Sequence, residues 1–403
     1  MTRQIIIIRQ RWFISLALIA IILSMASCFE YPRTIQSRKH VSRGSSRQTS
    51  LRSSPQPQQP TPNKEPIMTC TYDPSKKNYQ SMRIASLHRY AVKGLSGDSL
   101  VSVTLNEGDG TFEDDRRFAL LFDSSSDDNV GGDEKDAFDE ANPAWLHKAN
   151  FLCAFTAPEL LATLLTEYLI ESSSSGVRRL LRVRNRSNAC SSALLLEADL
   201  ASTIGREEAS KFFSDLCKRK VRCVVATNTS NLKEAESKHT HQFGNTSSGV
   251  KNNNGDTRTI HIINSNTVKD FSNRIFRNDT DDFLTSTRFR PNIIVDNLEP
   301  WAEFDLIGKT IEVIKDIDDS KNTSPSSSLR LRIVSRTVRC DGVGVDPCKP
   351  ELGKLDIPKL LVEHFPEYGP YLGVYAIVEK DSLKGDSGQR LCVGDSLRVV
   401  DGV

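Results

Sequence analysis

The sequence predicts a mainly β protein with some helices, an α+β fold built of two β-barrel-like domains. Short apolar runs separated by glycines begin at Met82, and a second series of apolar runs follows Thr259. Short strands at this spacing are typical of small barrels and curled sheets. The chain has 403 residues, which leaves room for two domains after an N-terminal targeting segment is subtracted.

Composition and charge give no indication of a nucleic acid partner. The chain has 53 Lys and Arg against 51 Asp and Glu, a net charge of +2, whereas a nucleic-acid-binding protein usually carries a concentrated basic face. The nine cysteines include no Cys-x-x-Cys pair, so neither a zinc knuckle nor a disulfide framework is predicted. We therefore expect the mature domains to reside in a reducing compartment.

Residues 1–28 are expected to be a signal peptide or a membrane anchor. An apolar run from Trp12 to Cys28 follows Arg3, Arg9 and Arg11. The run is shorter than the roughly 20 residues that comfortably span a bilayer, which favours a signal peptide. The alternative is an anchor, with membrane association through residues 12–28.

Residues 29–80 resemble a transit peptide followed by a Pro/Gln-rich linker. Basic residues and serines fill residues 31–54 without any acidic residue. The junction around Cys28-Phe29 is similar to that of bipartite presequences in algae with secondary plastids. We expect a plastid location in such an alga, and a membrane-anchored or mitochondrial location is the alternative.

The first expected domain covers residues 81–233. Strands are expected over residues 83–89, 99–105, 118–122, 178–188, 192–198 and 221–226, with a helix over 206–220. A further helix is expected to start at Thr156, with Glu159 completing a capping box and leucines continuing at helical spacing to Leu169. An acidic stretch, residues 124–140, is expected to be a surface loop.

The second expected domain covers residues 234–403 and opens with a polar loop over 234–258. Strands are expected over residues 259–263, 293–295, 310–314, 329–334, 374–378 and 396–400. Helices are expected to begin at 264–267 and to cover 356–365. Residues 320–328 are interpreted as an inserted loop.

The clearest candidate for chemistry is Cys340. It follows Arg336 and Arg339 and precedes a glycine-rich turn. Cationic neighbours favour the thiolate form of a cysteine, and a thiolate is a soft metal ligand. From the residues alone, the alternative is an ordinary small core residue.

Several short motifs accompany this cysteine in a fixed order along the chain. They are Tyr90-Ala91-Val92-Lys93-Gly94, Asp115-Arg116-Arg117-Phe118, Ile260-His261-Ile262-Ile263-Asn264, Arg288-Phe289-Arg290-Pro291-Asn292, and Arg339-Cys340 with Val345-Asp346-Pro347. From about Met82 to the C-terminus this series resembles the MOSC family, the molybdenum cofactor sulfurase C-terminal domain, preceded by its N-terminal β-barrel domain. Within that family the chain is similar in architecture to the amidoxime-reducing members, of which the mitochondrial amidoxime reducing component is one.

The resemblance implies residues that hold the molybdenum cofactor, a molybdenum ion on a phosphorylated pterin (molybdopterin). The catalytic candidates are Cys340, as the thiolate ligand of molybdenum, and Asp346, which orders the loop near the metal. The cofactor-binding candidates are Lys93, Arg116, Thr267, Arg290 and Asn292. For each of these five, the alternative is a surface charge or a turn residue.

The resemblance also implies an enzyme, a molybdenum-dependent oxidoreductase of the amidoxime-reductase type. It would reduce N-hydroxylated substrates by oxygen-atom abstraction, with electrons from a small haem cytochrome and a flavin reductase. The alternative is a module that carries the molybdenum cofactor or sulfane sulfur on Cys340. Pyridoxal phosphate binding is a family-level association only, because the sulfurase domain that uses it would need several hundred further residues upstream.

Overall fold

The computed structural model describes residues 82–106, 110–123, 146–174, 176–186, 193–225, 242–243, 258–276, 283–315, 328–383 and 388–400. All of them belong to one compact unit, Thr71–Val403. The expected signal peptide or anchor (1–28), the transit peptide-like segment with its linker (29–80) and the loop at 124–140 lie outside the described residues. Nearly all of the loops expected at 234–258 and 320–328 lie outside them too.

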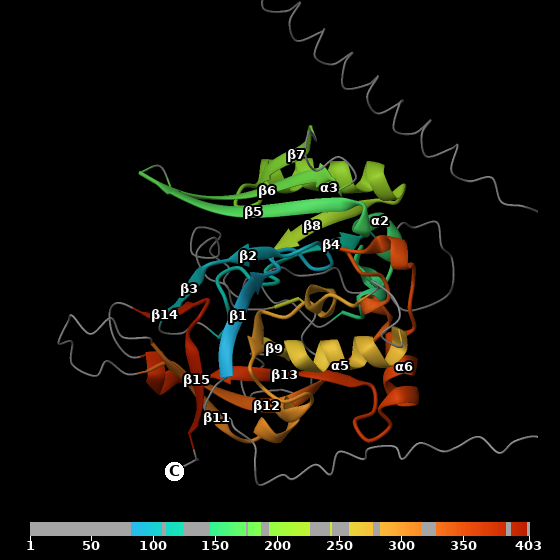
Figure 1. Ribbon diagram of the computed structural model, residues 1–403. Helices are drawn as coiled ribbons and strands as arrows, with labels where there is room; N and C mark the ends of the chain where they lie inside the picture. The colour runs from blue at the N-terminus through green and yellow to red at the C-terminus, as the bar shows by residue number, and fades with distance from the viewer. Residues whose placement is uncertain are drawn as a thin grey trace, which may run out of the picture. The chain divides into compact units, whose positions relative to one another are not determined.

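Seven strands close into a β-barrel, which confirms the predicted mainly β fold with helices and a barrel (Figure 1). In order around the barrel they are β10 (Ile293–Asp296), β9 (Ile260–Asn264), β13 (Tyr371–Val378), β12 (Arg330–Val338), β11 (Thr310–Ile314), β15 (Ser396–Val400) and β1 (Met82–Arg89). β1 pairs again with β10, and β2 (Asp98–Leu100) extends the sheet from β1. Inward-facing residues such as Ile84, Ile311, Leu331 and Val374 are buried in one apolar core.

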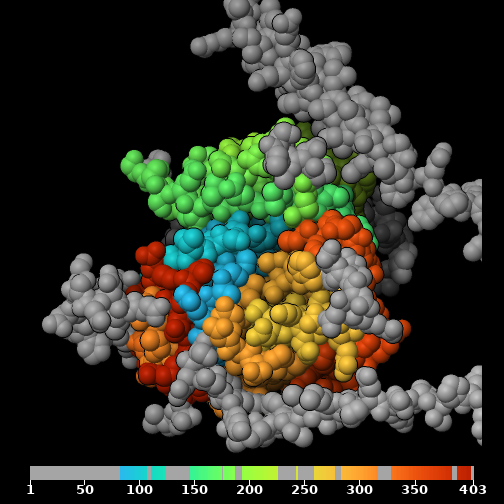
Figure 2. Space-filling model, viewed as in Figure 1, coloured from blue at the N-terminus to red at the C-terminus, as the bar shows by residue number. Residues whose placement is uncertain are grey.

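The barrel is closed by β1, which is distant in sequence from the other six strands. It pairs antiparallel with β10 through Leu87 and Ile293, and with β15 through Met82 and Leu397. A register shift between Ile84 and Ser86 marks a bulge, which bends the strand. In Figure 2 the blue residues that include β1 lie between the green sheets and the orange and red residues of the barrel.

A helix connects the pair of parallel strands in the barrel. β9 and β10 run parallel, and α5 (Ser265–Phe276) makes the crossover between them. Its buried stripe includes Val268 and Phe271, and the Phe271 ring packs 6.0 Å from Phe365, just after α6 (Ile357–His364). The two helices therefore cover the same side of the barrel.

Two of the three small sheets that the described residues form outside the barrel share a second core. β4 (Phe118–Phe122) pairs with β8 (Val221–Val225), and β5 (Leu164–Ser173), β6 (Gly176–Asn185) and β7 (Leu194–Asp199) form a three-stranded sheet. α3 (Thr203–Cys217) packs against β7 and β8, and Ser202 caps it by accepting a hydrogen bond from the N–H of Gly205. These elements share a second core, which includes Phe118, Leu181 and Phe213.

One predicted helix is largely a strand, so that prediction was wrong. α2 (Pro158–Ala162) ends after five residues, and β5 pairs with β6 along its whole length. The leucines at 160–169 fit a helical period, but Leu164, Thr166 and Tyr168 are the buried set, at a period of two. The Oγ of Thr156 donates to the carbonyl of Phe151 at 2.7 Å instead of capping the helix.

The remaining elements are short. The strand expected over 99–105 is interrupted into β2 and β3 (Ser102–Leu105), and β3 pairs with β14 (Gln389–Cys392), which was not predicted. The 3₁₀ helices are η3 (Lys148–Asn150), η6 (Ser286–Phe289), η7 (Ala302–Leu306), η8 (Asp341–Val343), η9 (Pro350–Leu352) and η10 (Lys380–Leu383). No helix among the described residues is both long enough and apolar enough to cross a membrane.

Candidate functional site

A cavity of about 400 Å³ gathers residues from distant parts of the chain. Four of the predicted site residues line it: Cys340, Lys93, Arg116 and Arg290. They follow β12 and β1 and precede β4 and β10, respectively. The structure thus brings together a thiol and three basic side chains that the sequence separates by up to 247 positions, from 93 to 340.

The described lining of this cavity is strongly cationic. It carries five basic side chains and no carboxylate; the five are Lys93, Arg116, Lys148, Arg290 and Arg339. Positive charges that line a low-dielectric cleft focus the potential and attract anions. Arginine adds a rigid, forked set of donors that suits phosphate oxygens.

Cys340 lies between the end of β12 and the start of the short helix η8. It is exposed, and its backbone is extended at the N-cap of η8. A Cβ placed on Gly342 would lie 3.6 Å from the Cys340 Sγ, so glycine at this position leaves the approach to the thiol open. An exposed sulfur at the edge of a cationic cavity can reach a ligand held inside it.

Arg288 holds the loop that follows Cys340 through hydrogen bonds to its backbone. This side chain is 1% exposed, and its Nε donates to the carbonyl of Val343 at 2.7 Å while its Nη2 donates to the carbonyl of Gly344. Its Nη1 lies 3.9 Å from the Oδ2 of Asp346. Burial lowers the pKa of Arg288 to about 10, so it stays charged at neutral pH.

Asp346 does not line the cavity. It is fully buried, and it accepts hydrogen bonds from the Thr285 Oγ at 2.9 Å and from the backbone N–H of Cys348 at 2.9 Å. These contacts tie the end of the Cys340 loop to the segment before η6. Asp346 therefore orders the loop and does not face the cavity.

Arg116 and Arg290 both have left-handed backbone conformations, with φ of 54° and 57°. Such conformations are uncommon for residues other than glycine and cluster at functional sites. They are held by a hydrogen bond from the Arg116 Nη2 to the carbonyl of Arg290 at 3.0 Å, and by hydrogen bonds from Arg116 to Asp115 and from Arg290 to the carbonyl of Leu95. Both guanidinium groups also lie over the Tyr90 ring.

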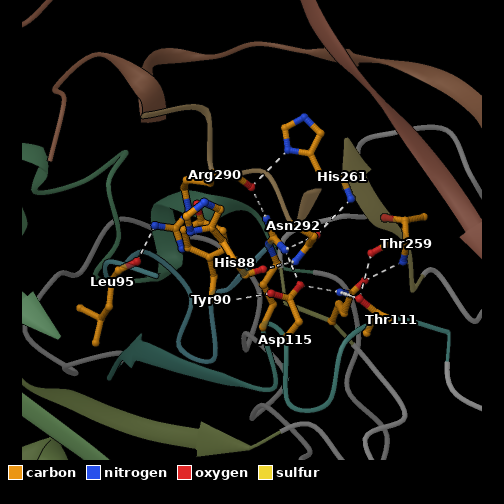
Figure 3. A network of polar contacts seen from close by, with 11 residues as sticks. His88, Tyr90, Leu95, Thr111, Asp115, Thr259, His261, Arg290 and Asn292 are labelled. Carbon is orange, nitrogen blue, oxygen red and sulfur yellow. Dashed lines mark hydrogen bonds and ion pairs between the residues drawn. The ribbon is translucent and has the colours of Figure 1, made fainter. Parts of the chain in front are cut away.

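The surroundings of Arg116 and Arg290 shift the pKa values of the two side chains in opposite directions. Burial works against the charge of Arg116, but the neighbouring Asp115 carboxylate raises its pKa overall. Burial lowers the pKa of Arg290 to about 10. Asp115 also accepts from the Gln242 Nε2 and the Tyr90 N–H, both at 2.8 Å, so it has several partners in the network of Figure 3.

Asn292 lies behind the cavity and orients its wall. Its Oδ1 accepts from the backbone N–H of His261 at 3.0 Å, and its Nδ2 donates to the carbonyl of His88 at 3.2 Å (Figure 3). It joins β1, β9 and the turn before β10, and it is fully buried. The structure therefore places Asn292 in contact with cavity residues but not on the lining.

Lys93 lines the cavity, and the residue after it, Gly94, lies close to the backbone of Cys153. Burial lowers the pKa of Lys93 to about 8, and the charges of Arg290 and Arg116 act in the same direction. The next residue, Gly94, has φ of 89°, and a Cβ there would lie 2.5 Å from the Cα of Cys153. Glycine is required at this position by both the backbone conformation and the space.

The lining also contains residues that were not predicted as site residues, among them His261, Arg339 and Tyr375. Arg339 is 8% exposed, and its Nη1 lies 3.4 Å from the Nε2 of His261. Since guanidinium only donates, this ring nitrogen accepts, and the Nδ1–H donates to the carbonyl of Arg290 at 3.2 Å. Burial, together with the Arg339 and Arg116 charges, lowers the pKa of His261 well below its usual range, so the ring is neutral. A lone histidine inside the apolar run of β9 was the signal available in the sequence.

Two buried polar atoms on the cavity wall have no hydrogen-bond partner in the part of the chain that the structure describes. They are the Nε of Arg339 and the Oγ of Thr337, which is 2% exposed. Buried polar atoms are rarely left without a partner. Together with the cationic lining, they fit a polar, anionic ligand such as a pterin phosphate.

Thr267 lies away from this lining, near the start of α5. Its Oγ donates to the Oε2 of Glu303 at 2.8 Å and accepts from the N–H of Trp301 at 2.7 Å. Within the described residues, no group of three or more His, Cys, Asp or Glu side chains is arranged to hold a metal ion.

We compared the chain with known protein families and structures. Residues 249–398 match the model of the MOSC domain. The crystal structure of the YUAD protein from Bacillus subtilis is similar over 79% of this chain and 95% of that chain, at 11% identity and a TM-score of 0.31, which is too low to establish a shared fold. No curated protein matches the chain significantly. The matched region includes Cys340, Arg339, Arg290 and His261, and this part of the chain is a MOSC domain.

Proposed function

We propose that this chain binds a phosphorylated molybdenum–pterin cofactor in the cavity and reduces N-hydroxylated compounds with it. MOSC domains are associated with the molybdenum cofactor. The observation that carries the proposal is the juxtaposition of an exposed Cys340 thiol with a cavity lined by five basic side chains and no described carboxylate. This donor set suits a ligand with phosphate at one end and a soft metal at the other.

Each side chain has a distinct part in this proposal. Lys93, Arg116, Arg290 and Arg339 would hold the phosphate and pterin, and Cys340 would ligate the metal. When bound, the cofactor supplies two-electron chemistry that accepts an oxygen atom. Arg288 and Asp346 hold the Cys340 loop in place, and His261 and Asn292 fix Arg339 and Arg116.

The proposed reaction breaks the N–O bond of the substrate. Two electrons and two protons convert an N-hydroxylated amidine to the amidine and one water. We propose that the electrons arrive singly from a small haem cytochrome and a flavin reductase. Because Lys93 has a pKa of about 8 and lines the cavity, it can hold or release a proton there at neutral pH.

The test uses the purified full chain. Molybdenum and pterin content are measured, and benzamidoxime reduction is followed with a reduced viologen as the one-electron donor. We expect about one molybdenum per chain, with turnover that is lost in Cys340→Ala and retained in Cys348→Ala, a second exposed cysteine that does not line the cavity. Absence of molybdenum and turnover would overturn the proposal.

A second candidate is a carrier of the cofactor or of sulfane sulfur, favoured by the exposure of Cys340. A persulfide on Cys340, detected by mass spectrometry in a chain without turnover, would support the carrier over the enzyme. For location we propose the plastid of an alga with a secondary plastid. A fluorescent fusion of the full chain that localises to mitochondria or to another membrane would contradict this.

A further inference from the structure

The outer wall of the cavity differs from its cationic interior. It is formed by the segment of residues 146–155, which contributes Leu146, His147, Lys148 and Phe155 to the lining. The backbone of this segment is anchored: Leu152 donates to the carbonyl of Leu120 at 2.8 Å, and Phe151 bridges to Leu121 on β4. The wall is therefore preformed.

Phe155 and the Cys340 thiol both line the cavity near Gly342. The position that a Cβ on Gly342 would occupy is 3.6 Å from the Cys340 Sγ and 3.9 Å from the Cβ of Phe155. The two side chains thus flank the same small space. A flat group bound in this space would lie near both Cys340 and Phe155.

Lys148 completes this wall with a positive charge. Its Nζ lies over the Phe155 ring, 3.9 Å from the centroid, and the His147 ring meets the same ring edge-on at 6.2 Å. No carboxylate among the described residues lies within ion-pairing distance of Lys148. The cation is held at the wall by the aromatic ring and not by an acidic partner.

We propose that Phe155 and Lys148 form the substrate subsite and select planar N-hydroxylated compounds that carry an anionic substituent. Phe155 stacks on the planar group next to Cys340, and Lys148 pairs with the anionic substituent. The deeper basic residues are left for the cofactor. This inference rests on the proposed function, because it assigns the substrate class of the same site.

The first experiment compares benzamidoxime with 4-carboxybenzamidoxime as substrates of the full chain. We expect the native chain to have the lower KM for the carboxylated compound. Lys148→Gln should raise that KM by about 3- to 5-fold and leave the KM for benzamidoxime within about 2-fold, as loss of one partly exposed charge pair predicts. Phe155→Leu should raise the KM for both compounds by about 5-fold, because the aromatic contact is shared. Salt at 0.5 M should weaken the effect of Lys148→Gln.

Lys349→Gln is the matched control. Lys349 lies 3.4 Å over the Phe283 ring in the same kind of pair, outside the cavity lining. The KM values of the Lys349→Gln variant for both compounds should equal those of the native chain. A Lys148→Gln variant with the native preference for the carboxylated compound would overturn the inference, as would an equal effect of Lys349→Gln.

A calorimetric titration with both compounds, without an electron donor, separates this inference from the proposed function. If no form of the chain turns over but the native chain binds the carboxylated compound more tightly and Lys148→Gln loses that difference, the subsite stands and the reductase proposal fails. If turnover is present and the binding preference is unchanged in Lys148→Gln, the subsite is wrong and the reductase proposal stands.

Discussion

At the scale of single residues, the candidate site depends on side chains whose positions are fixed by partners behind the cavity. Arg116 and Arg290 have left-handed backbones that their hydrogen bonds stabilise. The Cys340 carbonyl accepts a hydrogen bond from the Val343 N–H at 3.1 Å, and Arg288 and Asp346 hold the loop that follows. Function at this site should therefore be sensitive to residues that never touch a ligand.

The first residue-scale prediction concerns Lys93. Its pKa of about 8 means that the side chain loses its charge as the pH rises above that value. Binding of a phosphate monoester, which is doubly ionised over this range, should weaken by about tenfold between pH 7 and pH 9.5, the effect of one charge-assisted hydrogen bond. Isothermal titration calorimetry across this range measures it.

Lys93→Arg provides the control for that pH dependence. Arginine stays charged throughout, so the variant should bind the monoester with a nearly flat pH profile up to about 9.5. Equal profiles for the native chain and Lys93→Arg would show that Lys93 does not contact the anion.

The second residue-scale prediction concerns Arg288. Arg288→Met removes a buried cation that lies 3.9 Å from the Asp346 carboxylate and donates to the carbonyls of Val343 and Gly344. We expect the free energy of unfolding to fall by about 3 to 5 kcal/mol, measured by urea denaturation. The rate of Cys340 alkylation in the folded protein should also change, because the loop after the thiol is released.

A double variant distinguishes the buried pair from general damage. In Arg288→Met with Asp346→Leu, neither charge is left alone, so the loss should be smaller than the sum of the two single losses. Strict additivity would contradict the coupling that we infer from the 3.9 Å separation between Arg288 Nη1 and Asp346 Oδ2.

At the scale of elements, polar side chains at the start of α5 join it to η7. Glu303 accepts from Thr267 at 2.8 Å and from the Asn264 Nδ2 at 3.2 Å, and it is 1% exposed. Burial raises the pKa of Glu303 to about 7. Thr267, predicted to bind the cofactor, makes hydrogen bonds to Glu303 and Trp301 within this junction.

This junction predicts a pH dependence of stability. Since the folded pKa is above the unfolded value of 4.5, the folded state binds more protons between pH 4.5 and 7, and stability falls as pH rises through that window. The loss attributable to Glu303 should be about 3 kcal/mol by pH 8. Glu303→Gln keeps an acceptor for Thr267 without the charge, so it should lose this part of the slope.

Urea unfolding of the native chain and Glu303→Gln at pH 5 and pH 8 checks the prediction. The variant should gain stability relative to the native chain at pH 8 and show little difference at pH 5. A difference between the two proteins that is the same at both pH values would rule out Glu303 as the titrating group.

At the scale of the whole molecule, the barrel cannot close without β1. β10 and β15 both pair with this strand, which comes from residues 82–89. Its removal would expose two strand edges and an apolar core. The basic lining of the cavity also draws Lys93 and Arg116 from the same N-terminal part.

We therefore predict that a chain cut to residues 234–403 does not fold cooperatively. Circular dichroism and urea denaturation should show no sharp unfolding transition, whereas residues 71–403 should retain one. Co-expression of residues 71–233 with 234–403 should restore a soluble complex. A cooperatively folded 234–403 fragment would show that β1 is dispensable.

The sequence alone predicted most strands of the barrel, since segments such as Ile293–Val295 and Thr310–Ile314 are short and rich in the β-branched apolar residues typical of strands. It failed at Leu164–Leu169, where the leucine spacing fits both periods and only pairing with β6 selects the strand. It also named Cys340, Lys93, Arg116 and Arg290, because their short motifs resemble a family.

Only the tertiary structure decided what surrounds those four residues. That Arg339, His261 and Lys148 share their cavity, and that Asp346, Asn292 and Thr267 lie off its lining, follows from how β1, β9, β10 and β12 close around one core. The spacing of residues along a chain sets the local period of a helix or strand. Which distant loops meet at one end of a barrel is determined by strand pairing and by the burial of a shared core, and neither can be read from local spacing.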